Sequence, residues 1–305
     1  AYTEAVSVNG LQSLLVNYKG NLVGEDYFNG GQQETLFQVR SVTKSIVSIL
    51  IGIAIEKGFI SGTDLSIIEE LSTYQNENNQ GLDLLTIEHL LTMSSGLEWN
   101  EMGGNEYSQW IYSQDKISYI LAKQILYVPG EVFNYNSGTS YLLSVILAET
   151  SGQSTLEFAN QYLFDPLGIN NVAWREIGGY NNGGSDLQIK TRDLIKIGEL
   201  YLNNGMYNGT QIVSSNWVNE SITSKIITGR SFYGSEYGYL WWLENFSGIE
   251  CFYAMGYGGQ FLFVLPEIEL IIVANSNPGT YGQAADQQWL GVYDFITDQV
   301  LPAFL

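Results

Sequence analysis

The chain has 305 residues with 45% hydrophobic content, enough for a sizeable core in one large domain or two closely packed lobes. Its formal net charge of −20 disfavours nucleic acids and anionic lipid surfaces as partners, because both repel a strongly acidic protein. The single cysteine, Cys251, and the single histidine, His89, exclude an internal disulfide and a zinc site built from His and Cys.

The sequence gives little about where the protein works. No stretch reaches the roughly 20 apolar residues that a membrane-spanning helix needs, so we expect no membrane span. The opening AYTEAV is compatible with a mature end left after processing, and this favours a periplasmic or secreted location over the cytoplasm. Neither the physiological substrate nor the oligomeric state follows from the sequence.

The first predicted elements are a hairpin and a long buried helix. Two apolar runs within residues 11–28 flank Lys19-Gly20-Asn21, whose residue types favour a turn. The run SVTKSIVSILIGIAIEKG, residues 41–58, is apolar at nearly every position from 46 to 55. A buried helix is therefore expected, with Ser41 in its first turn and Gly58 as its C-terminal cap.

Ser41 and Lys44 form a Ser-x-x-Lys motif at the start of this helix. Residues three apart share a helix face, so the Lys44 amine is expected beside the Ser41 hydroxyl. Burial lowers the pKa of a lysine and lets it act as the base that a weakly nucleophilic serine requires. The helix N-terminus adds partial positive charge and free N–H groups near the serine oxygen. The alternative is an ordinary N-cap serine with Lys44 reaching to solvent.

Two other candidates are interpreted as structural. A second Ser-x-x-Lys, Ser113 to Lys116, lies in a polar stretch and is attributed to chance, because its lysine is expected to stay solvated. A Ser-His-Asp triad requires His89, but the chain has no Gly-x-Ser-x-Gly elbow and His89 lies on the apolar face of a predicted helix. The base of a hydrolase here must therefore be a lysine, a tyrosine or a carboxylate.

The middle of the chain is predicted to be helical, and strands return towards its end. The expected elements are helices at 87–93, 107–125, 140–149 and 191–202, a loop at 181–185, strands within 238–245, 250–259, 260–267 and 269–276, and a helix at 283–295. Strands at both chain ends predict an α+β fold with one antiparallel sheet. We expect an α/β lobe from residues 1–61 and 186–305, a mainly helical lobe from 62–185, and an active-site cleft between them.

Four segments, taken in order, match the motifs of one known family. FQVRSVTKSIVSILIGIAIEKG is similar to its nucleophile helix, and HLLTMSSGLEW to its helix-and-turn segment. VPGEVFNYNSGTSYLLSVILAETSG resembles its second catalytic motif, and AMGYGGQFLFVLPEIELIIV its third motif with the strand that follows. The chain thus resembles the serine hydrolases of the class C β-lactamase, penicillin-binding-protein and DD-peptidase superfamily, closest to the esterase and 6-aminohexanoate-dimer hydrolase branch. The resemblance covers nearly the whole chain and implies a β-lactamase/transpeptidase-like fold.

The resemblance also implies the site residues. Ser41 matches the nucleophile, and Lys44 its general base or proton relay. Tyr135, one of 21 tyrosines, is singled out by its place in FNYNSG as the motif tyrosine that moves a proton. The backbone N–H groups of Ser41 and Gln260 are expected to form the oxyanion hole. The expected substrate-binding residues are Ser137, Tyr257, Gly258 and Gly259.

Two departures from the family bear on the substrate. Ser137 stands where the lactamases commonly have asparagine, and Tyr257-Gly258-Gly259 stands where they have Lys-Thr-Gly. The missing lysine removes a cation that recognises a substrate carboxylate, although Arg40 or another arginine could compensate. We therefore expect a serine hydrolase of the carboxylesterase or amidase type, with an acyl-enzyme at Ser41, no cofactor and no metal.

Other functions stay open. The alternatives are a D-alanyl-D-alanine carboxypeptidase, a class C-like β-lactamase or a non-catalytic, penicillin-binding-like protein that only binds such ligands. The last is disfavoured because an inactive relative is expected to lose Ser41, Lys44 or Tyr135, and all three are present.

At least two of the aromatic residues Tyr237, Tyr239, Trp241 and Trp242 are expected to be core packing. No role is assigned to Glu101 or Asp115.

Overall fold

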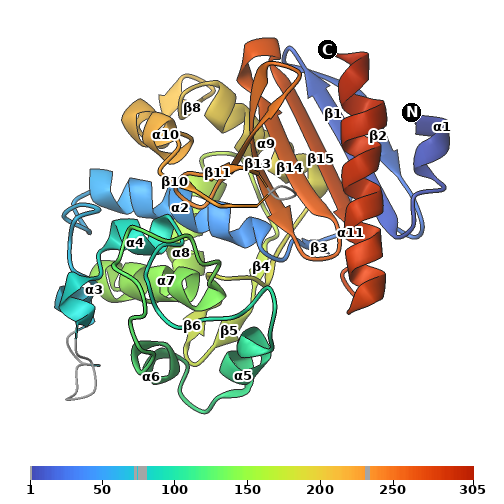
Figure 1. Ribbon diagram of the computed structural model, residues 1–305. Helices are drawn as coiled ribbons and strands as arrows, with labels where there is room; N and C mark the ends of the chain where they lie inside the picture. Colours follow the sequence, from blue (N-terminus) through green and yellow to red (C-terminus); the bar gives the residue numbers. More distant parts are fainter. Residues whose placement is uncertain (1, 72–73, 75–80, 231–233) are drawn as a thin grey trace.

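The computed structural model describes residues 2–71, 74, 81–230 and 234–305. An eight-stranded antiparallel sheet combines the two ends of the chain in the order β10-β11-β12-β13-β14-β15-β1-β2 (Figure 1). The strands are β1 (Leu11–Tyr18), β2 (Asn21–Tyr27), β10 (Ile226–Ile227), β11 (Glu236–Tyr237), β12 (Trp242–Phe246), β13 (Ile249–Gly256), β14 (Gln260–Leu265) and β15 (Leu270–Ser276). The predicted hairpin at 11–28 and the four C-terminal strands are confirmed.

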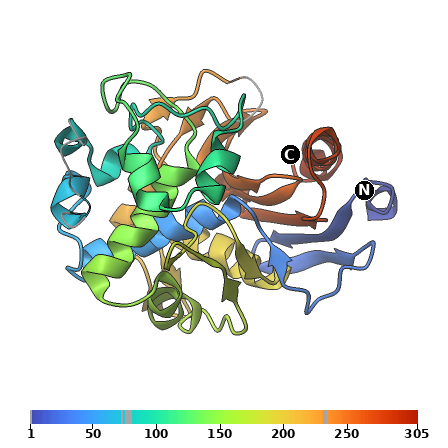
Figure 2. The ribbon, with the colours of Figure 1, turned by 90° about the horizontal axis from the view of Figure 1, so that it is seen from below.

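Helices cover both faces of this sheet, which explains why its central strands are apolar at almost every position (Figure 2). Every residue of β14 and β15 is buried. On one face α11 (Gln283–Phe295) brings Trp289 and Tyr293 against Phe261. On the other face α9 (Thr191–Leu202) packs on β15, β1 and β14.

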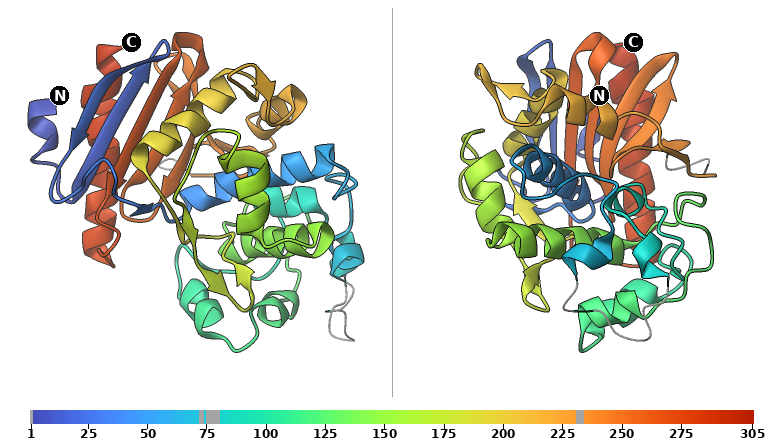
Figure 3. Two further views of the ribbon diagram at one scale, coloured as in Figure 1. Left: turned by 180° about the vertical axis from the view of Figure 1, so that it is seen from behind. Right: turned by 90° about the vertical axis from the view of Figure 1, so that its left-hand side faces the viewer.

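The predicted buried helix is α2 (Val42–Glu56), and it lies at the centre of the molecule (Figure 3). All its residues from Val42 to Ala54 are buried, because it packs against β13 and β14 on one side and α7 (Ser137–Ser151) and α10 (Ser215–Ser221) on others. A helix enclosed in this way needs apolar residues around its whole circumference. Its position explains the nearly uninterrupted apolar run that follows Lys44.

The region between the two parts of the sheet is mainly helical. It contains α3 (Ile67–Glu70), α4 (Ile87–Leu91), α5 (Glu106–Tyr112), α6 (Lys116–Leu121), α7 and α8 (Thr155–Ala159). The helix predicted at 107–125 is wrong as a single element: the chain leaves helical geometry at Ser113, and Asp115 caps α6 by accepting from the amides of Ile117 and Ser118. Helix α7 begins at Ser137, earlier than predicted, because Asn136 caps it through Gly138 and Thr139.

Short strands tie the helical region to the chain before Ser41. Strand β7 (Leu187–Ile189) pairs with both β3 (Phe37–Gln38) and β4 (Ala173–Trp174). The remaining short elements are α1 (Tyr2–Ala5), β5 (Glu176–Ile177), β6 (Tyr180–Asn181), β8 (Met206–Tyr207), β9 (Thr210–Gln211), η2 (Leu82–Leu84), η3 (Asn160–Phe164), η4 (Pro266–Ile268), η5 (Ile296–Val300) and η6 (Leu301–Ala303). The α+β class is confirmed, and the division into lobes at residues 62 and 185 stays a prediction. Among the described helices, none combines the length and apolar character required to cross a bilayer.

Candidate active site

Ser41 occupies the N-cap position of α2, but its hydroxyl does not cap the helix. Its backbone is helical (φ −72°, ψ −5°), and its side chain makes no capping hydrogen bond. The preceding residue, Arg40, has φ +52°, a left-handed conformation that is uncommon for a residue with a side chain. This turn joins β3 to α2, and the Ser41 hydroxyl accepts a hydrogen bond from Lys44 Nζ at 2.9 Å. The alternative of a capping serine with Lys44 reaching to solvent is therefore wrong.

Lys44 is buried and fully hydrogen-bonded. Its side chain does not reach solvent, since the residue is only 2% exposed. Besides Ser41, Nζ donates to Ser137 Oγ at 2.9 Å and to the Gly184 carbonyl at 2.6 Å. Burial lowers the pKa of Lys44 to about 8, and the negative charges of Glu101 and Asp186 act in the opposite direction. The amine can thus lose its proton near neutral pH.

Tyr135 lies against the same pair. Lys44 Nζ is 4.9 Å from the centroid of its ring, and the ring stacks on Trp242 with centroids 5.9 Å apart. Burial raises the pKa of Tyr135 above its ordinary value, as does the charge of Glu101, whereas a hydrogen bond with the Ser41 hydroxyl lowers it. The phenol is therefore neutral at physiological pH and carries a proton that it can donate.

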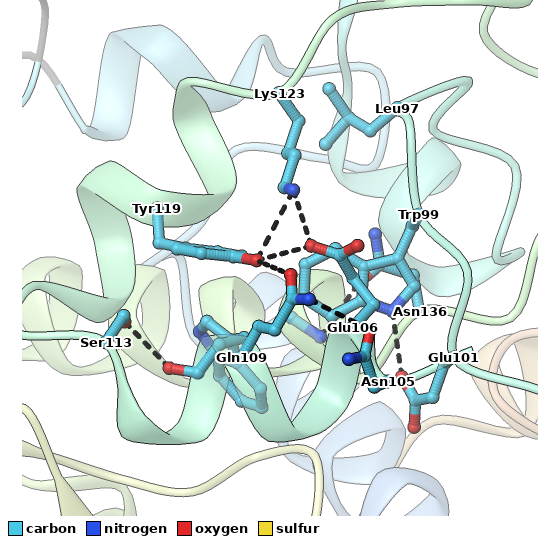
Figure 4. A network of polar contacts seen from close by, with 12 residues as sticks. Leu97, Trp99, Glu101, Asn105, Glu106, Gln109, Ser113, Tyr119, Lys123 and Asn136 are labelled. Atoms are coloured by element: carbon cyan, nitrogen blue, oxygen red, sulfur yellow. Dashed lines mark hydrogen bonds and ion pairs between the residues drawn. The ribbon is translucent and has the colours of Figure 1, made fainter.

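Glu101 is a member of this cluster that sequence reasoning missed. Its carboxylate accepts from Ser137 Oγ at 2.6 Å, from the Ser137 amide at 2.8 Å and from the Trp99 indole at 2.9 Å. Figure 4 shows the contact with Trp99, next to the Glu106–Lys123–Tyr119 network that joins α5 to α6. Glu101 is distant in sequence from both catalytic motifs, so no local pattern marks it.

The loop before β7 supplies the third partner of Lys44. A β-carbon at Gly184 would lie 2.7 Å from the Ser137 carbonyl, and one at Gly183 would lie 2.4 Å from the Ser140 carbonyl. The two glycines therefore let this loop pack directly on the first turn of α7 and bring the Gly184 carbonyl to Lys44. The loop itself was predicted, and its Gly-Gly pair was the only signal of a close approach.

The third-motif segment touches the nucleophile turn through Gly256. A β-carbon there would lie 2.4 Å from the Val39 carbonyl and 2.9 Å from Arg40 Cβ. A β-carbon at Gly258 would lie 3.5 Å from Gln288 Nε2 on α11, and one at Gly259 would lie 3.1 Å from Ser276 Oγ on β15. Their part in substrate binding stays a prediction. Tyr257, between these glycines and Gly256, is 41% exposed.

Gln260 is placed poorly for the role expected of it. The residue has no exposed surface, and its side chain exchanges two hydrogen bonds of 3.0 Å with the backbone of Ser276. An oxyanion-hole amide must meet the substrate, and a completely enclosed residue offers no such access. The amide that follows Gly256 belongs to Tyr257, and it lies at the end of the strand that packs on Arg40.

The close approach of Gly256 gives a prediction. Gly256→Ala is expected to lower kcat at least about 100-fold, because the added methyl must push β13 away from the turn that carries Ser41. Thermal melting should show a loss of about 1–3 kcal/mol. The control is Gly291→Ala, where a β-carbon meets nothing within 4 Å and a small gain in stability is expected. Wild-type activity in Gly256→Ala would contradict the role of this contact.

The structure supports the interpretation of the remaining candidates as structural. Ser113 Oγ donates to the Trp110 carbonyl at 2.7 Å, and Lys116 donates to the Ser113 carbonyl, so this pair holds a helix end. His89 completes the capping box of α4, accepting from the Thr86 amide through Nδ1 at 3.1 Å. The four aromatic residues at 237, 239, 241 and 242 are all buried. Of these, Trp242 also supports the ring of Tyr135.

An antiparallel sheet between helices, with the long buried helix α2 at its centre, is a β-lactamase/transpeptidase-like fold. The profile of the beta-lactamase family matches residues 10–293, and the chain belongs to this family. The resemblance stated from the sequence is thereby confirmed.

The chain is similar in sequence to a relative and in structure to two solved proteins. The 6-aminohexanoate-dimer hydrolase of Paenarthrobacter ureafaciens is 23% identical over 290 residues, which cover 85% of this chain and 71% of that protein. A putative 6-aminohexanoate-dimer hydrolase from Bacillus anthracis has a similar structure, with a TM-score of 0.82, 22% identity and coverage of 98% of this chain and 82% of that one. A family VIII carboxylesterase gives a TM-score of 0.70 at 17% identity, with 95% of each chain covered. The two structures show a shared fold.

Proposed function

We propose that the protein is a serine hydrolase that forms an acyl-enzyme at Ser41 and hydrolyses small, uncharged esters or amides. The observation that carries the proposal is the hydrogen bond between Lys44 Nζ and the Ser41 hydroxyl, because it joins a nucleophile to a buried base of lowered pKa. The names of two relatives, a 6-aminohexanoate-dimer hydrolase and a carboxylesterase, support an amide or an ester as the bond that is cleaved.

Acylation begins with proton transfer from Ser41 to Lys44. With a pKa of about 8, roughly a tenth of the Lys44 side chains are neutral at pH 7 and can accept this proton. The Ser41 oxygen attacks the carbonyl carbon, and the π pair moves to the carbonyl oxygen. When the bond to the leaving group breaks, Tyr135 donates its proton to the departing oxygen or nitrogen. The Lys44 ammonium then returns a proton to the phenolate.

Deacylation repeats the sequence with water as the nucleophile. Neutral Lys44 accepts the proton of the attacking water, and Tyr135 donates its proton to the departing Ser41 oxygen. The Lys44 ammonium then returns a proton to the phenolate. The balance is one water consumed, with one acid and one alcohol or amine released. All these steps use side chains of this chain, so the proposal requires no cofactor.

Two backbone amides are proposed to hold the oxyanion. One is the amide of Ser41 at the start of α2, where the helix dipole also favours negative charge. For the second we replace Gln260 with Tyr257, because Tyr257 is exposed and follows the glycine that packs on Arg40. One such donor contributes about 3 kcal/mol to the transition state.

Uncharged substrates are proposed because no lysine occurs in the strand and turn 249–260, where a family lysine would bind a carboxylate. The test combines three probes: a fluorophosphonate, p-nitrophenyl butyrate and benzylpenicillin. We expect a fluorophosphonate adduct at Ser41 by intact mass, rapid hydrolysis of the ester, and neither a lasting penicillin adduct nor loss of β-lactam absorbance.

The other outcomes identify the competing functions. A lasting penicillin adduct at Ser41 would favour a DD-peptidase, and loss of β-lactam absorbance would favour a lactamase. A folded protein that reacts with none of the three probes would be a ligand-binding relative, and the proposal would be wrong.

A further inference from the structure

Glu101 completes a hydrogen-bond chain whose direction can be assigned atom by atom. Its Oε2 receives two donors that have no acceptor capacity, the Ser137 amide at 2.8 Å and the Trp99 indole N–H at 2.9 Å. Its Oε1 receives the Ser137 hydroxyl at 2.6 Å. An ionised carboxylate can only accept, so the single proton of the Ser137 hydroxyl is committed to Glu101.

Because its proton is used in this way, Ser137 can form only one kind of hydrogen bond with Lys44. Because its proton points to Glu101, Ser137 Oγ can only accept from Lys44 Nζ, 2.9 Å away. The Gly184 carbonyl, 2.6 Å from Nζ, has no proton to donate. Of the three groups bonded to Nζ, only the Ser41 hydroxyl can therefore donate to the lone pair that a neutral amine carries.

We propose that Glu101 is a positioning residue that directs the lone pair of neutral Lys44 to Ser41 by holding the Ser137 hydroxyl in the accepting orientation. The inference rests on the proposed function, since it explains how the base is aimed at its nucleophile. It also gives a reason for a carboxylate beside the site, where its charge by itself favours the inactive, protonated lysine.

The charge of Glu101 acts alongside several neighbours. It raises the pKa of Lys44 together with Asp186, and it raises the pKa values of Tyr135 and Tyr107. Arg230 opposes it at Tyr135. Removing the Glu101 charge leaves Asp186 and Arg230 in place. The pKa of Lys44 is then lowered, and the amine becomes easier to deprotonate.

Glu101→Gln is the discriminating substitution because it keeps shape and reverses one hydrogen bond. The Ser137 amide and Trp99 indole both need an acceptor, so the amide oxygen of the new side chain faces these two donors. Its NH₂ group then faces Ser137 Oγ and donates to it. The Ser137 proton becomes free to turn to Lys44, where it competes with Ser41 for the lone pair.

The measurement is the rate of Ser41 labelling by a fluorophosphonate as a function of pH, followed by intact mass. We expect Glu101→Gln to lower the plateau rate roughly tenfold, part of what a general base contributes, and to move the acid limb of the profile to lower pH. The shift of the limb reports the removal of the charge, and the lower plateau rate reports the lost orientation of the Ser137 hydroxyl. Glu98→Gln, which removes the same charge from an exposed position of the same segment, should leave rate and limb unchanged.

A double-mutant cycle with Ser137→Ala tests the route through the hydroxyl. Without that hydroxyl there is no competing donor, so Glu101→Gln should change the plateau rate less than twofold in the Ser137→Ala background. An equal loss in both backgrounds, or a wild-type profile in Glu101→Gln, would overturn the inference. If wild-type protein is not labelled at Ser41 at all, the failure belongs to the proposed hydrolase function instead.

Discussion

Ser41→Ala is expected to lose p-nitrophenyl butyrate hydrolysis by at least about 10³-fold while keeping the wild-type melting temperature within a few degrees. The hydroxyl removed is the group that forms the covalent intermediate. Among the described residues, Ser137 provides the one other hydroxyl that is bonded to Lys44 Nζ. The fold should tolerate the change because the Ser41 side chain does not cap α2. Steady-state kinetics and intact mass after fluorophosphonate treatment provide the measurement.

The chain provides its own control for this variant. Ser113 begins the other Ser-x-x-Lys sequence, but its hydroxyl donates to the backbone carbonyls of Trp110 and Asp115. Ser113→Ala should therefore keep wild-type turnover and labelling. Activity of Ser41→Ala within tenfold of wild type, in a folded protein, would remove Ser41 from the mechanism.

Lys44→Met is expected to reduce turnover by a similar factor, since the buried base disappears while the volume of the side chain is nearly kept. In the wild-type protein, kcat/KM should rise about tenfold per pH unit up to about pH 8, because only the neutral amine accepts the Ser41 proton. The variant should lose this limb along with its activity. Lys116→Met, in the second Ser-x-x-Lys pair, is the control and should keep both.

The same variant should change stability with a definite pH dependence. Folding lowers the pKa of Lys44 from 10.5 to about 8, so between these values the unfolded chain binds more protons than the folded one. The free energy of unfolding contributed by Lys44 therefore rises with pH across this window and is lowest below pH 8. The free energy of unfolding of Lys44→Met minus that of wild type, measured by thermal melting, should therefore be more positive at pH 7 than at pH 10.5. An unchanged difference at the two pH values would mean that the buried amine has its ordinary pKa.

The fold was predictable where local patterns were strong. The apolar run after Lys44 and the apolar strands within 249–276 specify buried elements whatever their neighbours are. The break between α5 and α6 was missed because it depends on one capping side chain, Asp115, within a sequence that otherwise favours a helix. Helix α7 was predicted too short for a related reason, since its start is set by Asn136.

The candidate site also contains contacts that local sequence predicts and contacts that it does not. Ser41 and Lys44 share a helix turn, so their contact follows from spacing alone. The contacts of Ser137 and Tyr135 with this pair followed only from a family resemblance, because they join segments far apart in the chain. Glu101 and Gly184 were not predicted, since their roles depend on tertiary approach and on a carboxylate and a carbonyl without a local motif.

The pairing of β1 with β15 has a consequence for how the protein forms. Leu11 is the partner of Ser276, so β1 can complete its side of the sheet only after synthesis has passed residue 276. Contacts this distant in sequence carry a large loop-closure cost and slow the folding of a domain. Until then β1 lacks its partner strand β15 and the hairpin of β1 and β2 has an uncovered apolar face, which makes the incomplete chain prone to aggregation. Folding of the sheet is therefore expected to wait until β15 has been synthesised.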